Sequence, residues 1–244
     1  MKETKRKSEE SVRINKYLSQ AGVCSRRQAD VYVEQGKVLV DGIPAVSGTR
    51  VLPGQKVTFE GKPISIQEDL VFLAFHKPKG VVCTSSKIEK NNIIDYINYP
   101  VRIYPVGRLD KDSQGLILLT NDGEAANKIM KARNYHEKEY EVTVNKRIEK
   151  EFIDGMRRPV PLDEIGAVTR SCQVRKEGPN QFRIILTQGL NRQIRRMCEY
   201  FGYRVTKLKR VRIMNIHLGD LKEGEYRELT SDELHQLKKE LNRE

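Results

Sequence analysis

The sequence lacks the long apolar runs that would mark a membrane protein or a secreted one. No stretch approaches the about 18 apolar residues of a membrane-spanning helix, and residues 1–10 carry no apolar side chain after Met1. We therefore expect neither an anchor nor a signal peptide, and we predict a soluble, cytoplasmic protein with no membrane partner. Residues 1–10 are expected to form a mobile tail.

Cysteine and histidine are scarce and widely spaced. The four cysteines and four histidines form no pairs with the spacing of zinc ligands. We expect reduced thiols and no metal site. The residues concerned are Cys24, Cys83, Cys172, Cys198, His76, His136, His217 and His235.

Glycine-rich phosphate-binding loops are also missing. The sequence contains neither Gly-x-Gly-x-x-Gly nor Gly-x-x-x-x-Gly-Lys-Ser/Thr, the loops whose backbone N–H groups hold nucleotide phosphates. No cofactor is therefore expected, and the chemistry has to come from side chains.

Positive charge is abundant and concentrated in one region. The chain has 45 Lys and Arg against 33 Asp and Glu, a net charge of +12. Residues 181–212 contain nine basic residues and one acidic residue. Because an evenly solvated surface would not concentrate charge in this way, the sequence predicts a polyanionic partner.

The first part of the chain predicts a small domain. A helix is expected from Ser11, which can cap it, and a second helix from Ser25, where Gln28 completes a capping box. Strand-like segments at residues 37–40 and 57–59 suggest short hairpins. Together these segments predict a domain over residues 11–65.

A polar connector at residues 61–69 precedes a new apolar core that opens at Leu70. We therefore assign residues 66–244 to a second domain. Strand-like and helical segments follow one another there without regular alternation, strand-like residues 81–84 among them. The fold class is therefore α+β rather than a doubly wound sheet.

The first domain carries basic side chains that would follow a phosphate backbone. A solvated charged face is the ordinary explanation of such a basic helix pair. A DNA-binding helix-turn-helix is a further alternative, disfavoured because hairpins follow directly and no dimer-forming helix is present. The pattern of residues 12–18, 22–29 and 36–42 resembles the S4 RNA-binding domain. This resemblance covers about residues 12–60.

Three segments of the second domain offer different chemistry. Asp110 lies in the charged loop 107–116, which leads into the wholly apolar run 116–119 and so holds its side chains at the edge of the core. Tyr140 offers a flat face on which a flipped base can stack. Arg195 offers a bidentate cation that keeps a partly buried carboxylate ionised. A polar turn, a core aromatic and a phosphate contact are the ordinary explanations of the same three residues.

Four blocks of the second domain follow one family's pattern in order. They are Lys77-Pro78-Lys79-Gly80, residues 107–116, Lys138-Glu139-Tyr140 and residues 189–197. Together they resemble the pseudouridine synthases of the bacterial RsuA type. Within that type, the residues of these blocks are most similar to those of the RluF subgroup. The resemblance runs from about residue 12 to residue 234, the S4 segment included.

This resemblance implies the fold and the roles of the residues. It implies a mixed, mainly antiparallel sheet, with Asp110 as the catalytic aspartate, Tyr140 as the base-stacking residue and Arg195 as the cation that pairs with the aspartate. Some relatives have lysine at the position of Arg195. RNA contacts are predicted for Arg13, Lys16, Ser25, Arg26, Arg27, Lys37, Arg108, Arg192, Arg196, Lys209 and Arg210.

The implied reaction converts a uridine in ribosomal RNA to pseudouridine without a cofactor. The subgroup suggests 23S rRNA, with a tRNA anticodon as a second substrate, and small-subunit RNA stays open. We also expect a monomer. Asp110 would either attack C1′ or remove the C2′ proton, and no residue is assigned as the base that takes the C5 proton. The alternatives are a non-catalytic RNA-binding factor for ribosome assembly and an S4-containing methyltransferase, which the missing glycine-rich loop disfavours.

Overall fold

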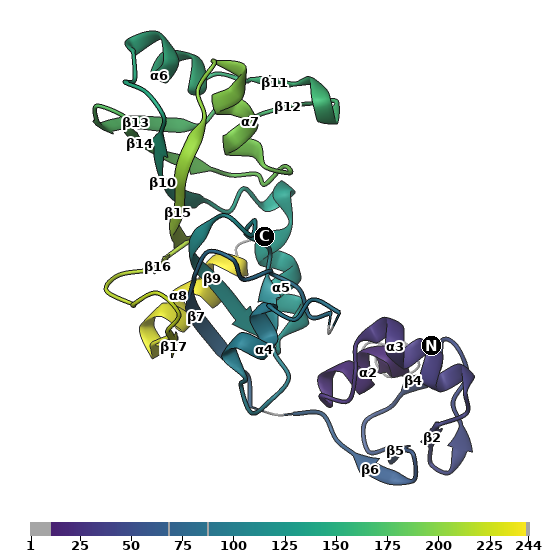
Figure 1. The fold of residues 1–244 in the computed structure, drawn as a ribbon. Helices are drawn as coiled ribbons and strands as arrows, with labels where there is room; N and C mark the ends of the chain where they lie inside the picture. Colours follow the sequence, from purple (N-terminus) through teal and green to yellow (C-terminus); the bar gives the residue numbers. More distant parts are fainter. Residues whose placement is uncertain (1–10, 68, 87, 243–244) are drawn as a thin grey trace. The chain divides into compact units, whose positions relative to one another are not determined.

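A computed structural model describes residues 11–67, 69–86 and 88–242, so the tail expected at residues 1–10 lies outside it. The chain divides into two compact units, Met1–Leu70 and Val71–Glu244, and Figure 1 shows the course of the chain through each. This division falls a few residues after the boundary placed at residues 65–66 by the sequence. No helix within the described ranges is long and apolar enough to cross a membrane.

The first unit contains two helices and short strands, in agreement with the predicted fold class. Helix α2 (Ile14–Gln20) and helix α3 (Arg26–Glu34) share an apolar core with a four-stranded sheet in the order β3-β2-β5-β6. The strands of this unit are β1 (Val12–Arg13), β2 (Val38–Val40), β3 (Ile43–Pro44), β4 (Arg50–Val51), β5 (Val57–Phe59) and β6 (Lys62–Ile64).

Two local predictions for this unit are wrong. Ser11 does not cap a helix, because residues 12 and 13 pair with β4 first and the hydroxyl of Ser11 accepts a hydrogen bond from Arg50 Nε at 2.7 Å. The expected connector begins with strand β6, which pairs with β5. Pro63 is tolerated there because β6 is an edge strand.

The second unit is built on a mixed, mainly antiparallel sheet, as expected. The nine described strands follow the path β13-β14-β10-β15-β9-β7-β17, with β16 added to β15 and β8 added to β9. Among these strands β15 and β9 pair in parallel, and the other neighbours pair antiparallel. Their bounds are β7 (Phe72–Lys77), β8 (Tyr104–Val106), β9 (Gln114–Thr120), β10 (Lys138–Val144), β13 (Gln173–Gly178), β14 (Gln181–Leu186), β15 (Val205–Ile213), β16 (Ile216–His217) and β17 (Tyr226–Glu228).

Five described α-helices, two short 3-10 helices (Ala132–Asn134 and Asp163–Ile165) and a small hairpin complete the second unit. The α-helices are α4 (Ile93–Ile97), α5 (Gly123–Met130), α6 (Lys150–Met156), α7 (Gln193–Tyr200) and α8 (Ser231–Leu241), and the hairpin joins β11 (Pro161–Leu162) to β12 (Ala167–Val168). Helix α8 begins with the capping box formed by Thr230 and Glu233, which its sequence pattern predicts.

Strand β9 is buried on both faces. Leu116 and Leu118 pack with residues of α5 and α8, which lie beside each other in Figure 1, whereas Ile117 and Leu119 belong to the main core on the other face. Double burial explains why residues 116–119 are all apolar. The sheet therefore holds the start of β9, and the loop before it, on a rigid support.

The other half of the sheet is covered on one face only. Val142 and Phe182 pack with α6 and α7 on the inner face, whereas the outer face is charged. There Arg183 pairs with Glu139 at 3.0 Å, with Glu141 at 2.9 Å and with Glu177 at 2.8 Å. The inner face is the one that carries the candidate site.

Candidate active site

Asp110 lies in the loop between β8 and β9. The amide of Ser113 donates to the carbonyl of Asp110 at 3.0 Å, which closes a turn just before the buried strand. The carboxylate side chain is 34% exposed, so it is held at the core edge and still reachable from outside. The sequence predicted this position at the core edge, because the charged loop 107–116 leads into the apolar run 116–119.

A buried lysine supports the neighbouring segment. Lys77, at the end of β7, is fully buried, and its Nζ donates to the carbonyl of Pro78 at 2.7 Å and to the carbonyl of Val81 at 2.8 Å. Burial lowers the pKa of this amine. The ammonium group thus organises a tight turn at residues 77–81.

That turn holds the loop of Asp110. The amide of Gly80 donates to the carbonyl of Lys111 at 2.8 Å, and the amide of Leu109 donates to Cys83 Sγ at 3.4 Å. The strand predicted at residues 81–84 is wrong: the segment makes a single bridge, from Val82 to Asn92. Its backbone groups bond instead to Lys77 Nζ, to Asn91 and to Ile93, and it contacts the Asp110 loop through the side chain of Cys83.

A cavity of about 790 Å³ opens beside Asp110. This volume lies in the range of pockets that hold ligands of nucleotide size. The structure brings Asp110, Tyr140 and Arg195 together on its wall, although they lie far apart in the sequence. Three predicted RNA contacts also line the cavity: Arg108, Arg192 and Arg210.

Arg195 faces Asp110 from the first turn of α7. Its Nε lies 3.9 Å from Asp110 Oδ2, and its Nη2 lies 3.5 Å from the carbonyl of Asp112 and 3.4 Å from Ser113 Oγ. The expected bidentate pair with the carboxylate is therefore not formed. The guanidinium instead contacts both the carboxylate and the backbone of its loop, so it fixes the loop as well as facing the charge.

Arg192 supplies a second cation at the same oxygen. Its Nη1 lies 3.8 Å from Asp110 Oδ2, and its side chain is partly exposed. Its backbone has φ +50°, in the left-handed region that non-glycine residues rarely adopt. Two guanidinium groups thus face one carboxylate, where the sequence predicted one.

Tyr140 lies on the inner face of β10 and is 8% exposed. Its partner in β15 is Arg210, whose guanidinium carbon lies 6.0 Å from the centre of the tyrosine ring. Lys138 precedes Tyr140 by two residues, faces the same side of the strand and lines the cavity. Burial and the charge of Arg210 lower the pKa of Lys138 to about 8.

Lys138 was not among the site residues predicted from the sequence. The sequence did contain a signal for it. Every second side chain of a strand lies on the same face, so a strand here puts Lys138 on the face of Tyr140. The role of Arg192 beside the carboxylate was missed as well, because the backbone conformation that turns it toward Asp110 leaves no pattern in the sequence.

Two predicted RNA contacts of the second unit lie outside the cavity. Arg196 donates to the carbonyl of Asn191 at 3.1 Å and forms an ion pair with Glu164. Lys209 pairs in register with Glu141, so it shares the charged outer face of the sheet. Neither residue is positioned to touch a nucleotide in the cavity.

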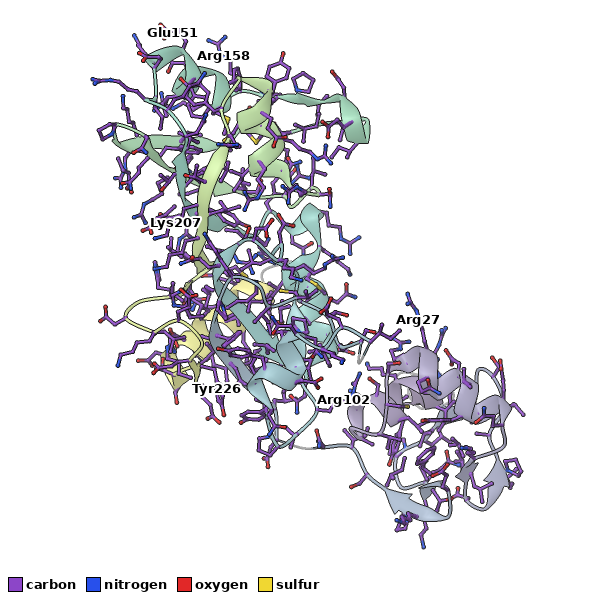
Figure 2. The ribbon with its side chains drawn as sticks, in the orientation of Figure 1. Arg27, Arg102, Glu151, Arg158, Lys207 and Tyr226 are labelled. Atoms are coloured by element: carbon purple, nitrogen blue, oxygen red, sulfur yellow. The ribbon has the colours of Figure 1, made fainter. Side chains whose placement is uncertain are left out.

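The predicted contacts of the first unit are divided. Arg13, Arg26 and Arg27 are exposed and Lys16 is half-buried; Figure 2 shows Arg27 projecting from α3. The other two make local contacts: Ser25 Oγ accepts from the amide of Gln28 at 3.2 Å as the N-cap of α3, and Lys37 Nζ pairs with Glu60 at 2.8 Å.

The four cysteines are free thiols. Across the described ranges, no group of three or more His, Cys, Asp and Glu side chains is arranged to hold a metal ion.

Two known sequence families match the two units of the chain. The sequence model of the RNA pseudouridylate synthase family matches residues 71–200, and that of the S4 domain matches residues 12–57. The chain belongs to the RNA pseudouridylate synthase family, and it carries an S4 domain before the catalytic unit. It is an enzyme that isomerises uridine in RNA.

The chain is also similar to individual proteins of this family. The chain is 56% identical over 226 residues to the dual-specificity RNA pseudouridine synthase RluF of Escherichia coli K12, a match that covers 92% of this chain and 77% of that protein. It is 34% identical over 233 residues to the ribosomal large subunit pseudouridine synthase B of Bacillus subtilis, covering 93% and 95%. A crystal structure of a pseudouridylate synthase matches with a TM-score of 0.69 at 27% identity, covering 93% of this chain and all of that one.

Proposed function

We propose that Asp110 is the catalytic residue that converts a uridine of 23S ribosomal RNA to pseudouridine, with a tRNA uridine as a second substrate. The observation that carries this assignment is the position of the Asp110 carboxylate, on the wall of the cavity with two arginines within 4 Å of one oxygen. Relatives named for the large ribosomal subunit and for dual specificity support the choice of substrates.

The reaction requires four changes at the nucleotide. The bond from N1 to C1′ breaks, the uracil turns, C5 forms a bond to C1′, and C5 then loses its proton while N1 gains one. Asp110 begins this sequence either by attacking C1′ or by removing the proton from C2′. In both cases the carboxylate has to be ionised and aimed, and the contacts of Arg195 with the loop and with the carboxylate oxygen serve both needs.

Tyr140 has a positioning role in this proposal. Its ring forms part of the cavity wall and is fixed by the strand that carries it. A uracil that has left its sugar needs a surface along which it can turn without escaping, and stacking on an aromatic face provides one.

The function is tested by replacing Asp110 with asparagine, which keeps the shape of the side chain and removes its charge. D110N should form no pseudouridine in a 23S rRNA transcript yet bind it within a few-fold of the unchanged enzyme. D112N is the matched control, because Asp112 lies in the same loop and its side chain does not line the cavity. Normal product formation by D110N would overturn the assignment.

The non-catalytic alternative, an RNA-binding factor for ribosome assembly, is not favoured, since the chain belongs to a family of enzymes. The cytoplasmic location and the monomeric state stay predictions. Mapping pseudouridine across all RNAs of a deletion strain identifies the substrate.

A further inference from the structure

Two cationic side chains line the cavity near Tyr140, one opposite it in the sheet and one two residues before it, and the proposed reaction does not yet use either of them. They are Arg210 on β15 and Lys138 on β10, neighbouring strands of the sheet. Asp110 is the one carboxylate that lines the cavity among the described residues, and it faces Arg192 and Arg195. The two cations therefore lack an acidic partner of their own within that lining.

Arg210 is almost fully buried, at 3% exposed. Its Nε donates to the carbonyl of Leu116 at 2.7 Å, whereas its buried Nη2 has no hydrogen-bond partner in the described structure. Leaving a charged donor unpaired away from water is costly. Such a group in the wall of a ligand cavity indicates that an acceptor on the ligand completes it.

Lys138 adds a second charge at the same place. Its Nζ donates to the carbonyl of His136 at 3.2 Å, and its pKa is lowered first by burial and then by the nearby charge of Arg210. Two like charges brought together in a buried site repel each other, and an anion placed between them relieves that repulsion. The pair therefore fits a ligand that carries negative charge.

We infer that Arg210 and Lys138 form a subsite for the detached uracil, in which they stabilise the negative charge that it acquires when its bond to the sugar breaks. This inference rests on the proposed function of the cavity. When the bond from C1′ to N1 breaks, its electron pair stays with the uracil, which becomes an anion shared by N1, O2 and O4. The sugar is left either bonded to Asp110 or as a glycal whose C2′ proton Asp110 has taken.

The same subsite serves both routes, because the uracil leaves with the electron pair in each. When C5 uses this electron pair to bond to C1′, Asp110 either leaves C1′ or returns its proton to C2′, and the uracil becomes neutral. The ring then loses the C5 proton and gains one at N1, with no further change of charge. Arg210 and Lys138 thus bind the intermediate more strongly than either the substrate or the product. A charge that acts on the intermediate alone raises the rate of the step rather than the affinity for RNA.

The test compares two leaving groups in one RNA stem-loop, with either uridine or 5-fluorouridine at the target position. Fluorine withdraws electron density, so 5-fluorouracil carries the negative charge with less help from the protein. Single-turnover loss of the starting nucleoside should fall about 100-fold for R210Q on uridine, and clearly less on 5-fluorouridine. K138Q should show the same ordering, and R210K should recover most of the rate.

An equal loss on both substrates, or no loss on uridine, would overturn the subsite. K207Q is the control, because it removes one charge from an exposed position of the same strand, labelled in Figure 2; it should change neither rate. If R210Q does not fold, K138Q decides the question, since that side chain makes a single described hydrogen bond. Activity in D110N would instead refute the proposed function itself, so the two failures are distinguishable.

Discussion

Gly115 on β9 lies against the backbone of Arg210 on β15, so close that a β-carbon at position 115 would overlap the carbonyl oxygen and the amide nitrogen of Arg210. The two residues are partners in the parallel pairing of these strands. Their contact joins the end of the Asp110 loop to the strand that carries Arg210. The spacing between the proposed catalytic carboxylate and the proposed uracil subsite therefore depends on a residue without a side chain.

Replacing Gly115 with alanine should destabilise the catalytic unit and lower its activity. Its φ of +111° and the backbone of Arg210 both oppose a β-carbon, so the loss should exceed the ~1 kcal/mol typical of an unfavourable glycine replacement. Chemical unfolding measures it. G219A is the matched control, because Gly219 also has positive φ but open space around it; equal losses for the two variants would contradict the argument.

Arg195 should be more sensitive to the loss of its charge than to a change of its shape. R195K keeps a cation beside Asp110 but loses the geometry that reaches both Asp112 and Ser113, so it should retain part of the activity. R195M should lose about 100-fold, the scale of a misplaced reacting group. Single-turnover rates measure both, and an R195M as active as R195K would show that the charge is dispensable.

The pH dependence of kcat/KM should reflect the deprotonation of Lys138. Its pKa is lowered to about 8, so its charge is present below that pH and disappears above it. The rate should therefore decline as the pH rises through about 8, because kcat/KM follows the groups of the free enzyme. The other charged groups of the cavity are Asp110, Arg108, Arg192, Arg195 and Arg210, and the arginines keep their charge throughout.

K138R tests this assignment. Arginine stays protonated, so the decline near pH 8 should disappear or move to higher pH. An unchanged profile would assign the decline to another group, such as the substrate uracil.

The exposed arginines of the S4 unit should control RNA affinity through its salt dependence. R13A and R27A together should weaken binding and reduce the slope of log affinity against log salt by about one unit for each phosphate that is no longer neutralised. R158A is the control, since Arg158 is an exposed arginine of the catalytic unit, labelled in Figure 2. If R13A and R27A leave the slope unchanged, these arginines do not contact RNA phosphates and form a solvated charged face instead.

The sequence predicted those helices and strands that are determined by residues close together in the chain. Ser25 is the N-cap of α3 as predicted, although Gln28 does not complete the expected capping box, and the apolar run at residues 116–119 is the buried strand expected of it. These signals are local, because a cap or a doubly buried strand leaves its mark on adjacent positions.

Contacts between distant segments could not be predicted in this way. Residues 12–13 form a strand because β4 lies beside them, and residues 81–84 do not, because their hydrogen bonds are made elsewhere. The same contrast holds for the residues of the candidate site. The resemblance to a family indicated Asp110, Tyr140 and Arg195, whereas Lys138 and the orientation of Arg192 emerge only when β10, β15 and α7 are assembled around one cavity.

The two compact units are parts of one chain, and this has a kinetic consequence. Once the S4 unit holds an RNA, the catalytic unit meets that RNA at an effective concentration set by the short connecting segment, whatever the bulk concentration. The cavity can then sample several uridines during a single residence on the RNA. Substitutions in the S4 unit can therefore change the affinity for RNA while leaving the residues of the cavity unaltered.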